Sequence, residues 1–153
     1  MKPILFLDVD GVLVGLQALN TLRGRELRLP YLQLKPLMGS FFQEARAHFD
    51  IVWATAWGEE ANGLLPALWG FPVPLPQFSL PAIPVGGDKL DEILAYTKGR
   101  KDWLWIDDSV WPDQVRRLQE AGCTGNFIHV SSAVEAEILL DMTLQWLDER
   151  RPT

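Results

Sequence analysis

The sequence predicts an α/β fold in which helices cover both faces of a central, mostly parallel sheet. Short apolar runs alternate along the chain with segments of helical spacing, and these runs are continuous rather than interrupted by polar residues. Hydrophobic residues make up 48% of the chain and charged residues 22%, as in ordinary globular proteins. The length of 153 residues points to one domain. We therefore expect a three-layer architecture with ligands bound at the carboxyl ends of the strands.

The order of the expected elements follows from these patterns. Residues 12–36 contain two glycines and two prolines without a clear period, which predicts an irregular excursion, and residues 71–86 are too rich in proline for a helix or a central strand. Asp88 is a helix cap, Pro112 suits a first helical turn, and Gly122 suits a helix stop. The expected strands are 4–9, 50–55, 103–107 and 126–130, and the expected helices are 37–49, 59–69, 88–97, 112–121 and a last one from Ser131 or Ser132 to about 148.

Two aspartates end the first expected strand. Asp8 and Asp10 are two residues apart, so both side chains lie on one side of an extended chain. Carboxylates this close repel unless a cation or protons compensate. An Asp-Gly turn would account for Asp10 followed by Gly11, but it leaves Asp8 inside an apolar run unexplained.

Four further polar residues lie at the ends of expected elements. Asp107 and Asp108 follow the apolar run WLWI, and two adjacent carboxylates beside a buried strand again favour a cation. Mg²⁺ prefers carboxylate oxygens, whereas the histidine and cysteine clusters typical of zinc sites are absent from the sequence. Thr55 ends the second strand, and Lys89 begins a helix where the dipole disfavours a cation. Taken alone, Thr55 could serve only as a strand-forming residue or a helix cap. Taken alone, Lys89 could be a charged residue exposed to solvent.

Taken together, these residues resemble the four motifs of the haloacid dehalogenase (HAD) superfamily. The segments DVDGV, WATAW and IDDS, with Lys89 before IDDS, stand in the order of that superfamily. The segments FLDVDGVL, ATAW and WIDDS are also similar to those of bacterial HAD domains associated with RNA-repair proteins. The resemblance implies a Rossmann-like fold and a Mg²⁺-dependent phosphatase that works through an aspartyl-phosphate.

The resemblance also implies roles for individual residues. Asp8 would be the nucleophile and Asp10 the general acid and base, while Thr55 and Lys89 would contact the phosphoryl oxygens. Mg²⁺ would bind Asp8, the backbone carbonyl of Asp10 and Asp108. Whether Asp107, Asp108 or Asp113 ligates the metal directly stays open at this point.

The excursion after the first strand is too short for a folded cap domain of typical size. We therefore expect a capless enzyme with an open site, which admits a macromolecular phosphate such as a nucleic-acid end or a protein surface. Two interpretations stand for the charged residues of the excursion, contact with an anionic substrate or plain solvation. The candidate substrate-side residues are Arg23, Arg25, Arg28, Ala56 and Trp57.

Charge and cysteine content limit the remaining possibilities. A net charge of −6 supplies no global field for non-specific nucleic-acid binding, and no apolar stretch is long enough for a membrane span. The single cysteine, Cys123, suits a reducing cytoplasm. A receiver domain uses similar residues, but its acidic pair precedes the phosphorylated aspartate, which is the wrong order here. A phosphotransferase and a degenerate binding module on the same fold stay as alternatives, and the oligomeric state is not predicted.

Overall fold

The computed structural model describes residues 1–8, 29–54, 88–130 and 136–151, with side chains in helix α2 described from Gly39 onward. Its elements follow one another as strands and helices in alternation. They are β1 (Ile4–Leu7), α2 (Leu29–His48), β2 (Asp50–Trp53), α4 (Lys89–Thr97), β3 (Trp103–Asp107), α5 (Pro112–Glu120), β4 (Phe127–His129) and α6 (Ala136–Glu149).

All four described strands pair in parallel, in the order β2-β1-β3-β4. Leu7 at the end of β1 pairs with Trp53 of β2 and with Ile106 of β3, so the three strands end at the same edge. The backbone continues this pairing beyond the strands, because the amide of Asp8 donates to the carbonyl of Ile106. The predicted mostly parallel α/β sheet is therefore confirmed, and the ends of β1 and β3 are neighbours.

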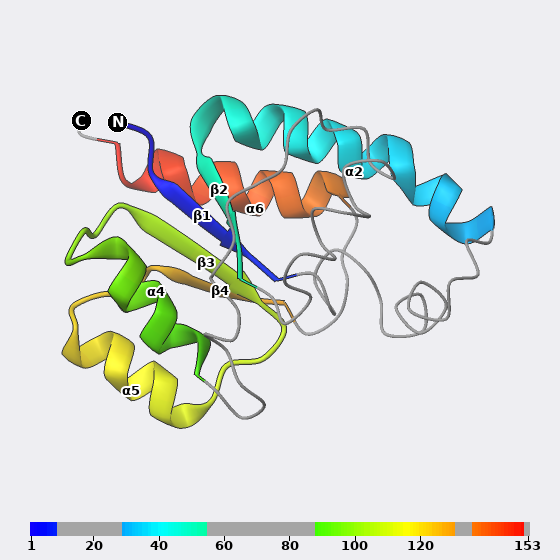
Figure 1. The fold of residues 1–153 in the computed structure, drawn as a ribbon. Coiled ribbons are helices and arrows are strands. Elements are labelled where there is room, and N and C mark those ends of the chain that lie inside the picture. Colours follow the sequence, from blue (N-terminus) through cyan, green and yellow to red (C-terminus); the bar gives the residue numbers. More distant parts are fainter. Residues whose placement is uncertain (9–28, 55–87, 131–135, 152–153) are drawn as a thin grey trace.

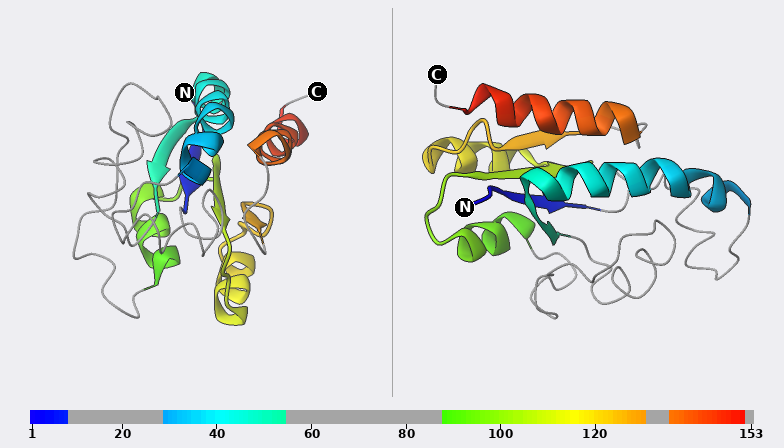
Figure 2. Two further views of the ribbon diagram at one scale, coloured as in Figure 1. Left: turned by 90° about the vertical axis from the view of Figure 1, so that its right-hand side faces the viewer. Right: turned by 90° about the horizontal axis from the view of Figure 1, so that it is seen from above.

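Helices cover both faces of this sheet. Helices α2 and α6 pack against each other on one face, while α4 and α5 lie on the other (Figure 1). The two views in Figure 2 show the same three layers. The fold is thus a small Rossmann-like α/β fold, and among the described residues nothing forms a separate cap. No helix in the described ranges is both long and apolar enough to cross a membrane.

The strands owe their continuous apolar runs to this burial on both faces. Ile4 and Phe6 of β1 share a core with Trp103 and Trp105 of β3, and this core packs under Leu90 and Ile93 of α4. Residues of the other parity, such as Leu5 and Leu104, are also fully buried. Burial of large aromatic side chains contributes strongly to the stability of such a core.

One predicted boundary, the start of the second element, was wrong by more than two residues. Helix α2 begins at Leu29, so residues 29–36, expected to be irregular, are helical. Pro30 occupies the first turn, where a proline loses no helical hydrogen bond, and Pro36 removes a single bond from a helix of 20 residues. The expected helix over 59–69 and the residues of the excursion before 29 lie outside the described residues.

The other described elements match the sequence closely. Strand β3 and helix α4 have the predicted bounds, α5 ends within one residue of its predicted end, and Gly122 follows it with a φ of 70° that favours glycine. Strands β1 and β2 end at Leu7 and Trp53, before the described residues Asp8 and Ala54 that were predicted to continue them, and β4 is one residue shorter than predicted at each end. The last predicted residues of the first two strands, 9 and 55, lie outside the described residues. The start of α6 is described only from Ala136.

Candidate active site

Asp8 lies directly after β1 at the carboxyl edge of the sheet. Strand β1 is buried throughout, and Asp8 itself is only 3% exposed. Side chains alternate between the two faces of a strand, so the side chain of Asp8 lies on the same face as those of Ile4 and Phe6. That face of the sheet packs against helix α4. An ionised carboxylate at such depth requires a nearby compensating charge.

Asp107, the last residue of β3, follows the same alternation. It shares the α4-facing side with Trp103 and Trp105, and it is 1% exposed. Its Oδ2 accepts hydrogen bonds from Lys89 Nζ at 2.8 Å and from Trp105 Nε1 at 3.2 Å, and its Oδ1 accepts from the amide of Ser109 at 3.0 Å. Three donors thus fix both oxygens of this carboxylate.

Lys89 is the first residue of α4 and reaches up to the sheet edge. Its ammonium group lies 3.0 Å from Asp8 Oδ1 and 2.8 Å from Asp107 Oδ2. Burial alone would lower the pKa of Lys89, but the negative charges of Asp8 and Asp107 outweigh burial and raise that pKa. The lysine is therefore a fixed cation between two buried carboxylates, at a helix terminus that by itself disfavours positive charge.

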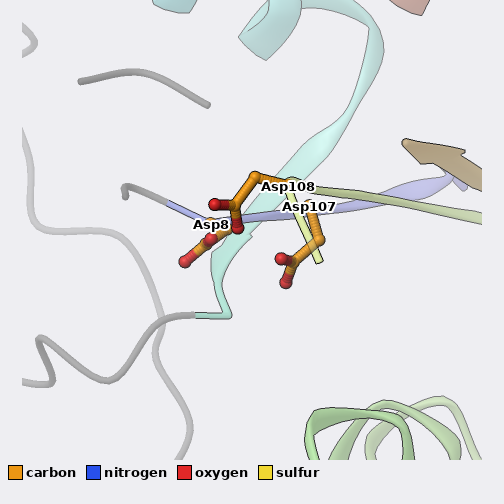
Figure 3. Close-up of side chains that lie close together, drawn as sticks. All are labelled: Asp8, Asp107 and Asp108. Carbon is orange, nitrogen blue, oxygen red and sulfur yellow. The ribbon is translucent and has the colours of Figure 1, made fainter. Parts of the chain in front are cut away.

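Asp108 completes a cluster of three carboxylates. One oxygen from each of Asp8, Asp107 and Asp108 lies within 4.8 Å of the others, and Figure 3 shows the three side chains gathered at the ends of β1 and β3. Burial first, then the hydrogen bond shared with Asp107 and its negative charge, raises the pKa of Asp108. The hydrogen bond to Asp8 and the charge of Lys89 act in the opposite direction.

The charges and ligand atoms of this cluster fit a divalent cation. Among the described residues, three carboxylates face one ammonium group, which leaves a surplus of negative charge when all three are ionised. Carboxylate oxygens are the ligands preferred by hard divalent ions. Each of the three carboxylates offers one oxygen to such an ion, and these oxygens all lie within 4.8 Å of one another. Asp8, Asp107 and Asp108 are therefore the described residues that could hold a metal.

The structure brings together four of the residues predicted from the sequence, namely Asp8, Lys89, Asp107 and Asp108. Asp113 is not in the cluster, because it lies on α5 with an exposed side chain paired to Arg116. The remaining candidates lie outside the described residues, so their predicted roles stay predictions. These are Asp10, Arg23, Arg25, Arg28, Thr55, Ala56 and Trp57.

Several residues around the cluster were not singled out by the sequence. The indole of Trp105 donates to Asp107, and the two-residue spacing on one strand is the signal that would have indicated this. The Nε2 atom of His129 lies 2.9 Å from the backbone carbonyl oxygen of Asp108. Strand β4 places it there, because His129 pairs with Asp107 in the sheet.

Comparison with known proteins agrees with the fold and the cluster. A family model described as "HAD domain in Swiss Army Knife RNA repair proteins" matches residues 4–135, which is most of the chain and includes every motif discussed above. No curated protein and no solved structure matches the chain. The order of the motifs, the parallel sheet and this match agree, and the chain belongs to the family of HAD domains in Swiss Army Knife RNA repair proteins.

Proposed function

We propose that the protein is a Mg²⁺-dependent phosphomonoesterase that acts through an aspartyl-phosphate on Asp8. The observation that carries this proposal is the ammonium group of Lys89 held between Asp8 and Asp107, beside Asp108, at the carboxyl edge of a parallel sheet. Membership of a HAD family supports a hydrolase of this type. A nucleophilic carboxylate splits one difficult displacement into two easier ones.

In the first step an oxygen of Asp8 attacks phosphorus. A bond forms between that oxygen and phosphorus, the bond to the ester oxygen breaks, and Asp10 gives its proton to the leaving alcohol. In the second step Asp10 takes a proton from water and the water oxygen attacks phosphorus. The bond between phosphorus and the Asp8 oxygen breaks, which frees the Asp8 carboxylate and inorganic phosphate. The role of Asp10 rests on the family resemblance, since that residue lies outside the described part of the chain.

Lys89 and the metal would balance the charge of the phosphoryl group. Lys89 is already within 3.0 Å of the attacking carboxylate, so it can stabilise the negative charge on the phosphoryl oxygens without reorganisation. Asp107 keeps that ammonium group in place. Mg²⁺ held by Asp8 and Asp108 would supply electrostatic stabilisation of the transferring group and orient it toward Asp8.

Replacement of Lys89 by methionine is expected to lower kcat by about 100-fold or more. One charge pair at about 4 Å interacts by roughly 4 kcal/mol in an effective dielectric of about 20, and each 1.36 kcal/mol of lost transition-state stabilisation corresponds to a tenfold rate. Steady-state kinetics with a small aryl phosphate measures this loss. Lys98→Met, which removes an exposed lysine just after the same helix, serves as the control. An active, folded Lys89→Met enzyme would exclude a catalytic role for Lys89.

The substrate class we propose is the phosphorylated end of a nucleic acid. The family is described by its occurrence in RNA repair proteins. Trp111, which caps α5, is 51% exposed and stands three residues after Asp108 in the chain. At 3.8 Å per residue, its Cα atom lies within about 11 Å of that of Asp108. An exposed indole at that range is suited to stack on a base next to the reacting phosphate.

A comparison of substrates tests this proposal. We expect kcat/KM to be higher for a 3′- or 5′-phosphorylated oligonucleotide than for the matching mononucleotide or a phosphopeptide. Trp111→Ala should lower kcat/KM by about 5- to 100-fold for the oligonucleotide, because stacking on an aromatic side chain contributes about 1–3 kcal/mol per base. Trp111→Phe should retain most of the preference, and hydrolysis of a small aryl phosphate should not change.

Two results would contradict it. If the mononucleotide reacts as efficiently as the oligonucleotide, or Trp111→Ala affects both equally, the site does not recognise a nucleic-acid end. If no phosphate ester is hydrolysed in the presence of Mg²⁺, the chain is a binding module on the HAD fold rather than a phosphatase.

A further inference from the structure

Asp88 links the first turn of α4 to helix α5. Its Oδ1 accepts hydrogen bonds from the amide of Leu90 at 2.9 Å and from Gln114 Nε2 at 2.8 Å, and its Oδ2 pairs with Arg117. A helix cap needs only the bond to the amide. The contacts of Gln114 and Arg117 with Asp88 are therefore not needed for the cap. They join helix α5 to the residue immediately before Lys89.

Gln114 is the more buried of these two side chains. It is 4% exposed, and its Oε1 accepts a hydrogen bond from the amide of Trp111 at 2.9 Å while its Nε2 donates to Asp88. Both ends of the buried amide are thus satisfied across two elements. Since a buried polar group costs free energy unless it is paired, such an arrangement specifies one relative position of α4 and the start of α5.

Arg117 adds a second connection one turn further along α5. It contacts Asp88 and also Asp91, so its guanidinium bridges the first turn of α4. The pKa of Asp88 lies below its ordinary value: burial acts to raise it, but the hydrogen bonds from Gln114 and Leu90 and the charge of Arg117 outweigh burial. Asp88 is therefore held as an anion next to Lys89.

These contacts close a ring through the active site. Asp107 at the end of β3 holds Lys89, the neighbouring Asp88 is held by Gln114, and Gln114 holds the amide of Trp111, four residues after Asp107. The amide of Ser109, which lies between Asp107 and Trp111 in the chain, also donates to the Asp107 carboxylate. The ammonium group of Lys89 is thus held by the carboxylates of Asp8 and Asp107. The backbone of Lys89 follows Asp88, which is held by the side chains of Gln114 and Arg117 from α5.

We propose that Gln114 and Arg117 are positioning residues, which hold Lys89 against Asp8 and Asp107 through the Asp88 carboxylate. The inference deepens the phosphatase function proposed above and rests on it for its kinetic consequence. Neither residue touches the carboxylate cluster in the described structure, so both act through Lys89. A misplacement of a catalytic group by about 1 Å can lower a rate by up to about 100-fold.

A set of variants distinguishes the positioning of Lys89 from a general effect on the stability of the fold. Gln114→Met and Arg117→Met remove the two contacts to Asp88 with little change in side-chain size. Arg116→Met is the matched control, because Arg116 precedes Arg117 on α5 and, among the described residues, pairs only with the surface residues Asp113 and Glu120. Asp88→Asn keeps the acceptor for the amide of Leu90 but loses the charge pair with Arg117, and so provides a milder variant that keeps the helix cap.

The kinetic test is a double-mutant cycle. We expect Gln114→Met and Arg117→Met each to lower kcat by about 10- to 100-fold, Asp88→Asn to lower it less, and Arg117→Lys to recover part of the loss. Added to Lys89→Met, neither Gln114→Met nor Arg117→Met should lower kcat further, because both act through the missing ammonium group. An equal loss in the Lys89→Met background, or a comparable loss in Arg116→Met, would overturn the proposal.

A second measurement does not depend on turnover. Nuclear magnetic resonance of ¹⁵N-labelled lysine ammonium groups, with the Lys89 signal assigned from its loss in Lys89→Met, reports the order of that group in the substrate-free protein. We expect Lys89 to become more mobile in Gln114→Met and Arg117→Met and to stay unchanged in Arg116→Met. An unchanged Lys89 signal in both variants refutes the positioning role. Loss of order in a protein that hydrolyses no phosphate ester would instead refute the phosphatase and support the positioning of Lys89.

Discussion

Asp8→Asn is expected to abolish hydrolysis, with a loss in kcat of at least about 10⁴-fold. The amide is a poor nucleophile and cannot form the acyl phosphate on which both steps depend. The fold should persist, because asparagine has nearly the same shape and Lys89 keeps its second partner, Asp107, at 2.8 Å. Steady-state kinetics and a thermal melt in the same buffer measure the two effects separately.

The leaving group distinguishes loss of the nucleophile from loss of the acid. The deficit of Asp8→Asn should be the same for aryl and alkyl phosphates, because the nucleophile acts on phosphorus in both. Asp10→Asn should lower kcat by about 10²–10⁴-fold for alkyl phosphates and by less for aryl phosphates, whose leaving oxygen needs no proton. If Asp8→Asn retained substantial turnover, Asp8 would not be the nucleophile.

Removal of divalent metal is expected to lower kcat by about 10³-fold or more, and addition of Mg²⁺ should restore it. The physical reason is the charge of the cluster, in which, within the described part of the chain, Asp8, Asp107 and Asp108 face one ammonium group. Without a cation the substrate phosphate would add further negative charge to this site. Full turnover in excess chelator would contradict this account.

The two acidic residues near the start of α5 provide a matched pair for the metal prediction. Asp108→Asn should raise the Mg²⁺ concentration for half-maximal rate by about 10- to 100-fold, whereas Asp113→Asn, which alters an exposed carboxylate paired with Arg116, should not. Binding of Mg²⁺ to the folded protein should also raise the melting temperature. That rise should be reduced in Asp108→Asn, and an equal rise in both variants would remove Asp108 from the metal site.

Local signals explain why much of the fold could be predicted from the sequence. The bounds of β3 follow from an apolar run that ends in two aspartates, and α4 follows from a capping aspartate before a periodic segment. Both signals lie within a few residues of the feature that they specify. Helix α2 shows the converse, because prolines at 30 and 36 argue locally against a helix that nevertheless runs through both positions.

Some parts of the candidate site could be predicted from the sequence and others could not. Asp8, Asp107 and Asp108 could be placed together, because parallel strands end at one edge and their order of motifs is that of the HAD superfamily. The connection of Asp88 to Gln114 and Arg117 could not, since these residues are 26 and 29 positions away in the chain and meet only through the packing of α4 beside α5. No periodicity in the sequence encodes such a contact.

The central claim is that phosphate passes through a covalent bond to Asp8, and trapping that bond tests it most directly. The enzyme would be mixed with ³²P-labelled substrate and Mg²⁺, quenched in acid within one turnover and digested for mass spectrometry. We predict an acyl phosphate that hydroxylamine cleaves, located on the peptide containing Asp8 and absent from Asp8→Asn. Turnover without any labelled protein, or label on a residue other than Asp8, would contradict the account.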